Sequence, residues 1–388
     1  MFVFFLLYLS SIFGSFCEAK HDTPVPLFNM SLKLIQVLTR HGMRTPIESF
    51  LPKSHRGEWI CDSYNALSQR IKSSPAERYR YYRQVIDTSY SEYPLNCRPG
   101  DLTIEGMEQH KRNGINYRKY LIDDLHFLPE TMDPKLFRFY SSPVERCMKS
   151  AESFLAGLYP PFSDNEVLSV ETGSPTLSPL MINPNQCAEL KALETEFFNS
   201  NEYKSYMESM WAVVEEAARY LNLSKSNSNI HTICQWAIAF NCTDKSRHPS
   251  FFSEEMVLRC QKQQAYNQFG FFGQSGKIGI ASAAPMRQLI QNADEAIGNG
   301  SGVRFVLHSA HDTTVAAILT LLGNVYDQIP PYSSHLAMEI WEDDWKLMYV
   351  RFVFNGLPLI PSGFNSSLVR FDDFRSYYSP IINHCNEI

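Results

Sequence analysis

The chain has 388 residues, of which 44% are hydrophobic and 20% are charged, and its formal net charge is −6. These values argue against a disordered or fibrous protein, and the acidic balance lacks the basic surface that binds duplex nucleic acid. The length corresponds to about two domains of roughly 150 residues each, or to one α/β domain that carries a large insertion.

Residues 1–19 have the features of a secretory leader. An apolar run from Met1 to Phe13 carries no charge, and small residues at Cys17 and Ala19 resemble a cleavage site. The run is short for a membrane span, and no apolar run of 18 residues follows it. We therefore expect a signal peptide over 1–19, with an uncleaved anchor or a buried first helix as the alternatives. The mature protein is expected to be secreted, or alternatively to lie in the lysosomal lumen, without a membrane span.

Cysteines and sequons agree with a secreted glycoprotein. Once the leader is removed, an even number of cysteines remains, which predicts disulfides whose pairing cannot be deduced from spacing. These candidates are Cys61, Cys97, Cys147, Cys187, Cys234, Cys242, Cys260 and Cys385. The candidate glycosylation sites, each an N-x-[ST] pattern, are Asn29, Asn222, Asn241, Asn299 and Asn365.

Three strand-then-helix units organise the chain. Strands are expected over 32–38, 136–140 and 303–308, each followed by a loop and a helical pattern. In the second unit, Ser142 and Glu145 form a capping box that predicts the helix start. Strands alternating with helices predict a mostly parallel sheet with helices on both faces, which is a three-layer α/β fold.

Three further patterns complete the fold prediction. A helix is expected over 103–120, a late strand hairpin over 335–354, and a smaller, mainly helical cap inserted at 166–272. The α/β domain is then discontinuous, and it comprises 30–165 and 273–380.

Cations and a His-Asp pair follow directly after these three strands. Ligands of open α/β sheets bind beyond the carboxyl ends of the strands, so these side chains should converge on one crevice. Three guanidiniums there need an anionic partner, and a phosphate dianion would accept bidentate hydrogen bonds from them. The residues concerned are Arg40, His41, Arg44, Arg146, His311 and Asp312.

Phosphoryl transfer would use these residues as follows. His41 is the nucleophile, because flanking arginines favour its neutral form by lowering its pKa. Asp312 protonates the leaving alcohol and later activates water against a phosphohistidine. His311 donates a hydrogen bond to a phosphoryl oxygen. Since arginines handle the charge, we expect neither a metal nor another cofactor.

The segment 40–46, Arg-His-Gly-Met-Arg-Thr-Pro, matches the R-H-G-x-R-x-P signature of the histidine acid phosphatases. The His-Asp segment 308–315 resembles the second signature of that family, and 102–110 resembles its L-T-x-x-G-x-x-Q helix start. The resemblance covers about Lys33 to Asn355. Within the family, the chain is most similar in type to animal prostatic, lysosomal and venom acid phosphatases. It implies a three-layer α/β fold with a helical cap, and hydrolysis of phosphomonoesters at acid pH through a phosphohistidine. It also implies that His41 and Asp312 are catalytic.

By the same resemblance, the phosphate-binding residues are Arg40, Arg44, Arg146 and His311. The chain departs from the family pattern R-S-x-D-x-x-R before Arg146, where Tyr140 and Pro143 replace the first Arg and the Asp.

The substrate is expected to be a small phosphomonoester or a phosphoprotein. Two alternatives stay open: a phosphatase specialised for one metabolite, such as an inositol phosphate or a lysophospholipid, and a non-catalytic secreted binding protein of the same fold. His-Asp in place of His-Ala-Glu argues against a dedicated phytase. A homodimer is possible, and no nucleic-acid partner is expected.

Overall fold

A computed structural model describes residues 15–47, 59–61, 97–160, 168–243, 249–298 and 302–385. Most of the expected leader and the sequon residue Asn299 lie outside these ranges.

The described strands form one eight-stranded mixed sheet in the order β3-β2-β4-β1-β5-β6-β7, with β8 paired to β6. Strands β1 to β4 run parallel to one another, and β5, which is antiparallel to β1, begins an antiparallel part of the sheet that continues through β6 to β7 and β8. The bounds are β1 Ser31–Arg40, β2 Phe137–Ser141, β3 Glu171–Thr172, β4 Phe305–Ala310, β5 His335–Glu342, β6 Met348–Phe354, β7 Leu357–Leu359 and β8 Leu368–Arg370. The three expected strands and the hairpin are thus confirmed, with shifts of a few residues at their ends.

Strand β1 lies at the centre of the sheet because both of its faces are apolar. Leu34 contributes to the core on one face, while Ile35 and Val37 contribute to the core on the other. This matches the near-continuous apolar sequence expected of a strand covered on both sides. Arg40 pairs with Ala310 in register, so the carboxyl ends of β1 and β4 lie side by side.

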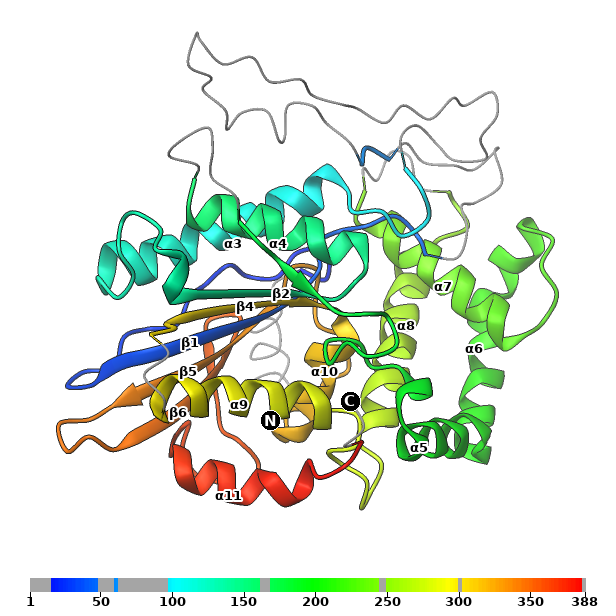
Figure 1. The fold of residues 1–388 in the computed structure, drawn as a ribbon. Helices are drawn as coiled ribbons and strands as arrows, with labels where there is room; N and C mark the ends of the chain where they lie inside the picture. Colours follow the sequence, from blue (N-terminus) through cyan, green and yellow to red (C-terminus); the bar gives the residue numbers. More distant parts are fainter. Residues whose placement is uncertain are drawn as a thin grey trace, which may run out of the picture.

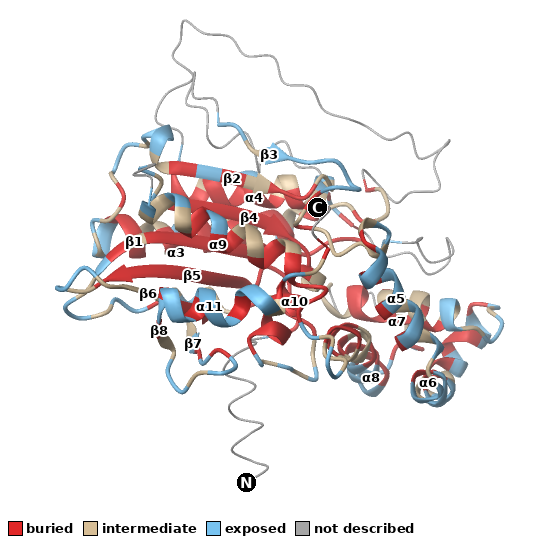
Figure 2. Ribbon diagram, turned by 60° about the horizontal axis from the view of Figure 1, so that its bottom comes forward, coloured by how far each residue is buried: buried red, intermediate tan, exposed pale blue. Residues whose placement is uncertain are grey.

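Helices cover both faces of the sheet (Figure 1). Helices α3 (Ile104–Arg118) and α4 (Glu145–Leu158) pack on one face, and α9 (Ala283–Gly298) and α11 (Phe371–Ile381) lie on the other. Helix α10 (Asp312–Leu321) follows β4 directly. The central strands are buried between these layers (Figure 2), which confirms the three-layer α/β class.

Four helices form a group beside the sheet, which we call the helical cap (Figures 1 and 2). They are α5 Ala188–Asn199, α6 Asn201–Tyr220, α7 Asn227–Asn241 and α8 Glu254–Ala265. The helices α6, α7 and α8 each begin after a serine whose hydroxyl accepts a hydrogen bond from the first turn. One apolar core runs from the sheet into these helices, so the cap shares its core with the sheet; its division into a separate domain stays a prediction.

The disulfides correct two expectations from the sequence. The pairs are Cys17–Cys242, Cys61–Cys97, Cys187–Cys385 and Cys234–Cys260. Cys147, an expected partner, is unpaired and buried. Cys17, expected to leave with the leader, is bonded to the end of α7. The sequence prediction left out Cys17 because eight cysteines follow Ala19. An even number of cysteines, however, does not show which one stays unpaired.

The segment 15–19 is part of the folded structure, which limits where a leader can end. Phe16 and Ala19 are buried, the Ala19 N–H donates to the carbonyl of Tyr332 (2.9 Å), and Gln109 donates to the Cys17 carbonyl (2.8 Å). A leader that ends at Ala19 is therefore incompatible with the Cys17–Cys242 bond. The leader itself stays a prediction, and a cleavage site that preserves this bond lies before Cys17.

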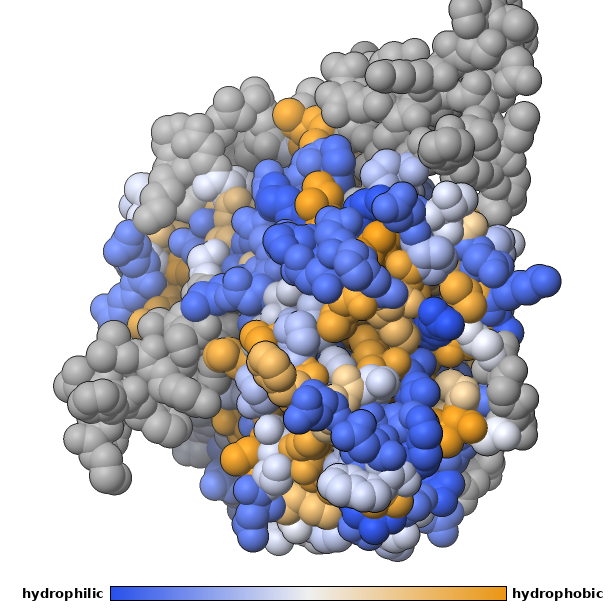
Figure 3. All heavy atoms as spheres, turned by 90° about the vertical axis from the view of Figure 1, so that its left-hand side faces the viewer, coloured by the Kyte–Doolittle hydropathy of each residue, from blue (hydrophilic) through white to orange (hydrophobic). Residues whose placement is uncertain are grey.

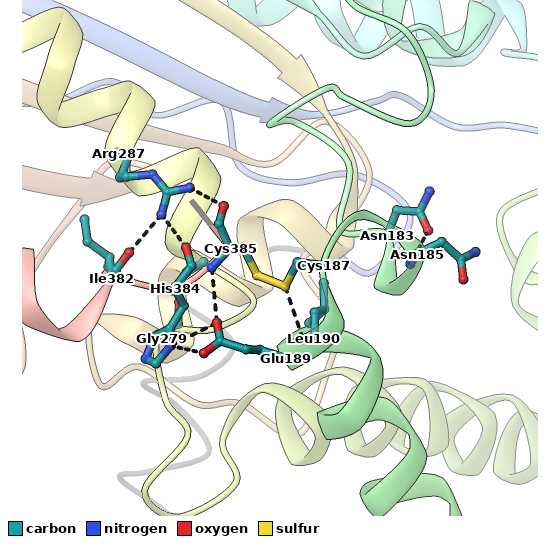
Figure 4. The surroundings of a disulfide bond; sticks show 11 residues. Asn183, Asn185, Cys187, Glu189, Leu190, Gly279, Arg287, Ile382, His384 and Cys385 are labelled. Carbon is teal, nitrogen blue, oxygen red and sulfur yellow. Dashed lines mark hydrogen bonds and ion pairs between the residues drawn. A yellow bond between two sulfur atoms is a disulfide. The ribbon is translucent and has the colours of Figure 1, made fainter. Parts of the chain in front are cut away.

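The C-terminal segment is fixed to the cap by a second disulfide (Figure 4). Cys385 is bonded to Cys187 at the start of α5, and its N–H donates to Glu189 (3.2 Å). Arg287 of α9 donates to the carbonyls of Ile382, His384 and Cys385 (2.9, 2.5 and 2.8 Å). The chain after α11 is thus fixed both to the cap and to the sheet-covering helix α9.

The surface of the described residues bears on the expected glycosylation sites and on membrane spans. The face at the hairpin end of the sheet is mostly polar, with hydrophobic atoms between polar ones (Figure 3). None of the helices described is long and apolar enough to cross a bilayer. Asn29, Asn222 and Asn365 are exposed, whereas Asn241 is half-buried. Glycosylation stays a prediction at these positions.

Peptide mapping of the purified protein without reduction tests the disulfide pattern. We expect a peptide that contains Cys17 linked to one that contains Cys242, because both thiols are held within bonding distance by buried neighbours. Cys147 should react with a thiol reagent only after unfolding, since the fold buries it. A mature protein that begins at Lys20, or a peptide cross-linked through Cys147, would contradict this arrangement.

Candidate active site

The site lies where β1 and β4 end side by side. After β1 the His41 N–H donates to the carbonyl of Ala310 (3.0 Å), and the His41 carbonyl accepts from Ser333 (3.2 Å). The loop 41–46 is therefore attached to β4 on one side and to the segment before β5 on the other. This attachment places the side chains of both strand ends in one crevice.

Helix α3 holds the backbone of the same loop. The Thr103 hydroxyl donates to the Met43 carbonyl (2.9 Å), and the Gln109 side chain accepts from the Met43 N–H (2.9 Å). His110 donates from Nε2 to the Arg40 carbonyl (3.0 Å). Burial lowers the pKa of His110 to about 3, so its ring is neutral and serves as a fixed donor.

Close contact between the loop and α3 requires two glycines. A Cβ on Gly42 would lie 2.2 Å from the carbonyl oxygen of Gly106, and a Cβ on Gly106 would lie 2.3 Å from that of Met43. The L-T-x-x-G-x-x-Q pattern thus serves to pack α3 against the loop that carries His41.

His41 presents a free ring nitrogen. Its Nδ1 lies 2.8 Å from the Gly42 carbonyl, and because a carbonyl only accepts, Nδ1 carries the proton and Nε2 has the lone pair. The side chain is 1% exposed. Burial, followed by the charges of Arg146, Arg40 and Arg44, holds the pKa of His41 well below its ordinary 6.5. The ring therefore stays neutral in mild acid.

Arg40 is fully buried next to His41. Its guanidinium lies 4.2 Å from the centre of the Tyr332 ring, donates to the Pro330 carbonyl, and forms an ion pair with Asp312 (3.2 Å). Burial lowers the pKa of Arg40, while Asp312 opposes that change. The two residues Pro330 and Tyr332 carry no motif of their own, which is why the sequence did not indicate them.

The other two arginines complete a positive cluster. Arg44 donates to its neighbour's carbonyl at Thr45 (2.9 Å), and Arg146 at the start of α4 lies 3.4 Å from His311. Burial and then Arg44 lower the pKa of Arg146 to about 10, so Arg146 is charged in acid. The buried Nε atoms of Arg40, Arg44 and Arg146 have no hydrogen-bond partner within the described residues. Buried donors without partners fit an anion in this crevice.

His311 and Asp312 enter the site from the end of β4. The rings of His41 and His311 are 5.8 Å apart. Burial and then Arg146 lower the pKa of His311 to about 3, so it is neutral. Burial would raise the pKa of Asp312, but Arg40 and Arg44 outweigh that effect and hold it below its ordinary value. All six expected site residues are therefore brought together.

The capping box expected at Ser142 and Glu145 does not form. Helix α4 begins at Glu145 after Val144, which makes no side-chain cap. The Ser142 hydroxyl instead bonds Nε2 of His311 (2.8 Å), a contact across 169 positions of the chain that a local pattern cannot reveal. Tyr140, which replaces the family's arginine, stacks on His308 with ring centres 5.3 Å apart.

Comparisons with known proteins agree with this geometry. The family model described as "Histidine phosphatase superfamily (branch 2)" matches residues 31–355. Counting factor 60 of Dictyostelium discoideum is 25% identical over 374 residues, which is 92% of this chain and 88% of that protein. Lysophosphatidic acid phosphatase type 6 of Bos taurus is 23% identical, over 92% of this chain and 85% of that protein.

A solved structure shows the same fold. The phytase from Citrobacter braakii superposes with a TM-score of 0.60 at 15% identity, covering 91% of this chain and 98% of that chain. The chain belongs to the histidine phosphatase superfamily, branch 2, as its two signatures predicted. It is a phosphatase of the histidine acid phosphatase type.

Removing one guanidinium should change the pH dependence through His41. Arg146→Gln removes the positive charge that lowers the pKa of His41 most, so this pKa rises and less of the ring is neutral in acid. We expect the acid limb of kcat/KM to move to higher pH than in the wild type.

Lys149→Gln is the matched control for this variant. Lys149 lies on the same helix, but it pairs with Glu145 at the surface and does not face His41. Lys149→Gln should leave the acid limb of kcat/KM at the same pH as in the wild type. An acid limb in Arg146→Gln that coincides with the control would contradict the assigned electrostatics.

Proposed function

We propose that this protein is a secreted acid phosphatase that hydrolyses phosphate monoesters through a phosphohistidine on His41, with Asp312 as the proton donor. The observation that carries the proposal is the free lone pair on Nε2 of a buried, neutral His41 among three guanidiniums. A nucleophile of this kind needs the phosphate charge neutralised before it can attack.

The reaction has two balanced steps. Nε2 of His41 attacks phosphorus, the P–N bond forms, and the ester P–O bond breaks as Asp312 gives its proton to the leaving oxygen. Water then attacks the phosphohistidine, Asp312 takes the water proton, and the P–N bond breaks to release phosphate. The Nδ1–H bond to the Gly42 carbonyl holds the ring in one orientation through both steps.

Asp312 must be protonated for the first step, and substrate binding supports this. Without substrate, Arg40 and Arg44 hold the pKa of Asp312 low, so it is ionised. A phosphate dianion adds negative charge next to Asp312 and engages the same guanidiniums, which raises its pKa. Acidic medium then favours the protonated carboxyl in the complex, in agreement with an acid phosphatase.

The charge of the transferred group is met by side chains of this chain. Arg40, Arg44 and Arg146 supply donors toward the crevice, and His311 adds a neutral one. Neither a metal nor another cofactor is part of the proposed mechanism, which predicts that EDTA leaves the rate unchanged.

A lysophospholipid phosphatase is the second candidate. The observation that favours it is the relative named lysophosphatidic acid phosphatase type 6, which matches nearly the whole chain at 23% identity. A substrate panel separates the two candidates, since a specialist shows one dominant kcat/KM. The third reading, a binding protein without turnover, is disfavoured because His41 and Asp312 are both present and adjacent to the guanidiniums.

Hydrolysis of p-nitrophenyl phosphate from about pH 3.5 to 8 tests the proposal. His41→Ala should lose activity by about a thousandfold or more, because the other nucleophilic group of this loop, the Thr45 hydroxyl, is buried and donates to the Arg98 carbonyl (2.8 Å). Asp312→Asn should lose about 10²- to 10⁴-fold on an alkyl phosphate and less on p-nitrophenyl phosphate, whose leaving group needs less protonation.

His384→Ala is the control for histidine loss, because His384 pairs with Glu189 at the surface near the C-terminus. It should behave as the wild type. Full activity in His41→Ala would refute the phosphohistidine mechanism, and a wild type that binds phosphate but turns over no phosphomonoester would favour the binding protein.

A further inference from the structure

His311 is held by two side chains that the histidine phosphatase signatures do not include. The Ser142 hydroxyl lies 2.8 Å from Nε2, and the Cys147 sulfur lies 3.8 and 3.7 Å from Nδ1 and Nε2. Both residues come from the loop and first turn after β2. Burial raises the pKa of the Cys147 thiol to about 11, so it stays protonated and donates to the Ala310 carbonyl (3.1 Å). Cys147 therefore packs against the ring without competing for its nitrogens.

The position of the Ser142 hydroxyl is fixed by the backbone around it. The Ser142 N–H donates to the Ser309 carbonyl (2.9 Å), and the Ser309 hydroxyl donates to the Cys147 carbonyl (2.7 Å). Ser142 is fully buried. The hydroxyl proton of Ser142 can rotate about the Cβ–Oγ bond while the buried oxygen stays next to Nε2.

Without substrate, the neighbours of His311 define its tautomer. Nη2 of Arg146 lies 3.4 Å from Nδ1, and a guanidinium can only donate. Nδ1 therefore accepts, and the single proton of the neutral ring is on Nε2, from which it is donated to the Ser142 oxygen.

Phosphate binding needs the other tautomer. Nδ1 is the ring nitrogen that faces Arg146, and so it faces the phosphate that Arg146 would hold. Phosphoryl oxygens only accept, so His311 can contribute a hydrogen bond only if Nδ1 carries the proton. In the free protein, burial and then Arg146 lower the pKa of His311 to about 3, and the proposal takes the ring to stay neutral when phosphate binds. Nε2 must then accept, and a serine hydroxyl can donate to it as readily as it accepted before.

We propose that Ser142 is a positioning residue whose hydroxyl reverses its hydrogen bond to His311, so that His311 donates from Nδ1 when phosphate binds. This inference rests on the proposed function, because it assigns His311 a hydrogen bond to the phosphate. Ser142 is thus a seventh residue of the site, and its role is to set which ring nitrogen of His311 carries the proton.

Steady-state kinetics of single variants give the first test. Ser142→Ala leaves Nε2 without a partner, so kcat/KM and the affinity for inorganic phosphate as an inhibitor should each fall by about 10-fold or more. Ser142→Thr keeps the hydroxyl and should recover most of the loss. Ser141→Ala is the matched control, because that buried hydroxyl donates to the Ser142 carbonyl (2.8 Å) rather than to His311. This variant should stay within about 3-fold of the wild type.

A double-mutant cycle shows whether Ser142 acts through His311. If it does, Ser142→Ala should have little further effect in a His311→Ala background. Equal losses in both backgrounds, or equal losses in Ser142→Ala and Ser141→Ala, would overturn the proposal.

Nitrogen-15 NMR of histidine-labelled wild-type protein reports the tautomer directly and does not depend on a variant folding. His311 should be protonated on Nε2 in the free protein and on Nδ1 with inorganic phosphate bound. Protonation on the same nitrogen in both states would overturn the proposal even if the enzyme is active. Failure of the proposed function is separate, since it would appear as a wild type without turnover or as an active His41→Ala.

Discussion

Three guanidiniums packed around one neutral imidazole are the constraint on which the rest of the site depends. Like charges in a buried crevice repel one another, and burial lowers the pKa values of Arg40 and Arg146. The fold tolerates the cluster by giving each cation its own partners: Arg40 contacts a carbonyl, an aromatic face and Asp312, Arg44 donates to a carbonyl, and Arg146 lies next to His311. Burial, and after it the same positive charges, lower the pKa of His41. In the proposed mechanism the cluster therefore both binds the anion and helps to keep the nucleophile neutral.

A loop that carries repelling cations needs its backbone held by neutral groups. Helix α3 supplies them, because Thr103, Gln109 and the neutral His110 all bond backbone atoms of the loop rather than its side chains. The pair Gly42 and Gly106 brings the helix close enough for these bonds. The side chains of the loop are thereby left available to substrate, and the motif on α3 has a structural role beside the chemical role of the loop.

The fold, and the six candidate residues that it brings into one crevice, could be predicted because their signals are local. Apolar runs, caps and the residues that follow strand ends are visible within about ten positions of the chain. Ser142 could not be assigned in this way. Its sequence context favours a helix cap, but a buried imidazole brought next to it by the pairing of β2 with β4 is the stronger partner. The prediction of the bonded cysteines was wrong for a related reason. An even number of cysteines could not show that Cys17 is bonded and that the buried Cys147 is not. The boundary between cap and α/β domain stays a prediction.

The N-terminal segment connects the cap to the arginine beside the nucleophile. Phe16 lies 5.9 Å from Tyr332, ring centre to ring centre, and the Arg40 guanidinium lies within 5.8 Å of one ring and 4.2 Å of the other. One residue further on, Cys17 is bonded to Cys242 at the end of α7. Because the backbone of this segment also bonds Tyr332 on both sides, removal of residues 15–19 would expose the aromatic face that supports Arg40. If a leader is cleaved as expected, the packing around Arg40 and the Cys17–Cys242 disulfide both require residues 16 and 17 to remain in the mature protein.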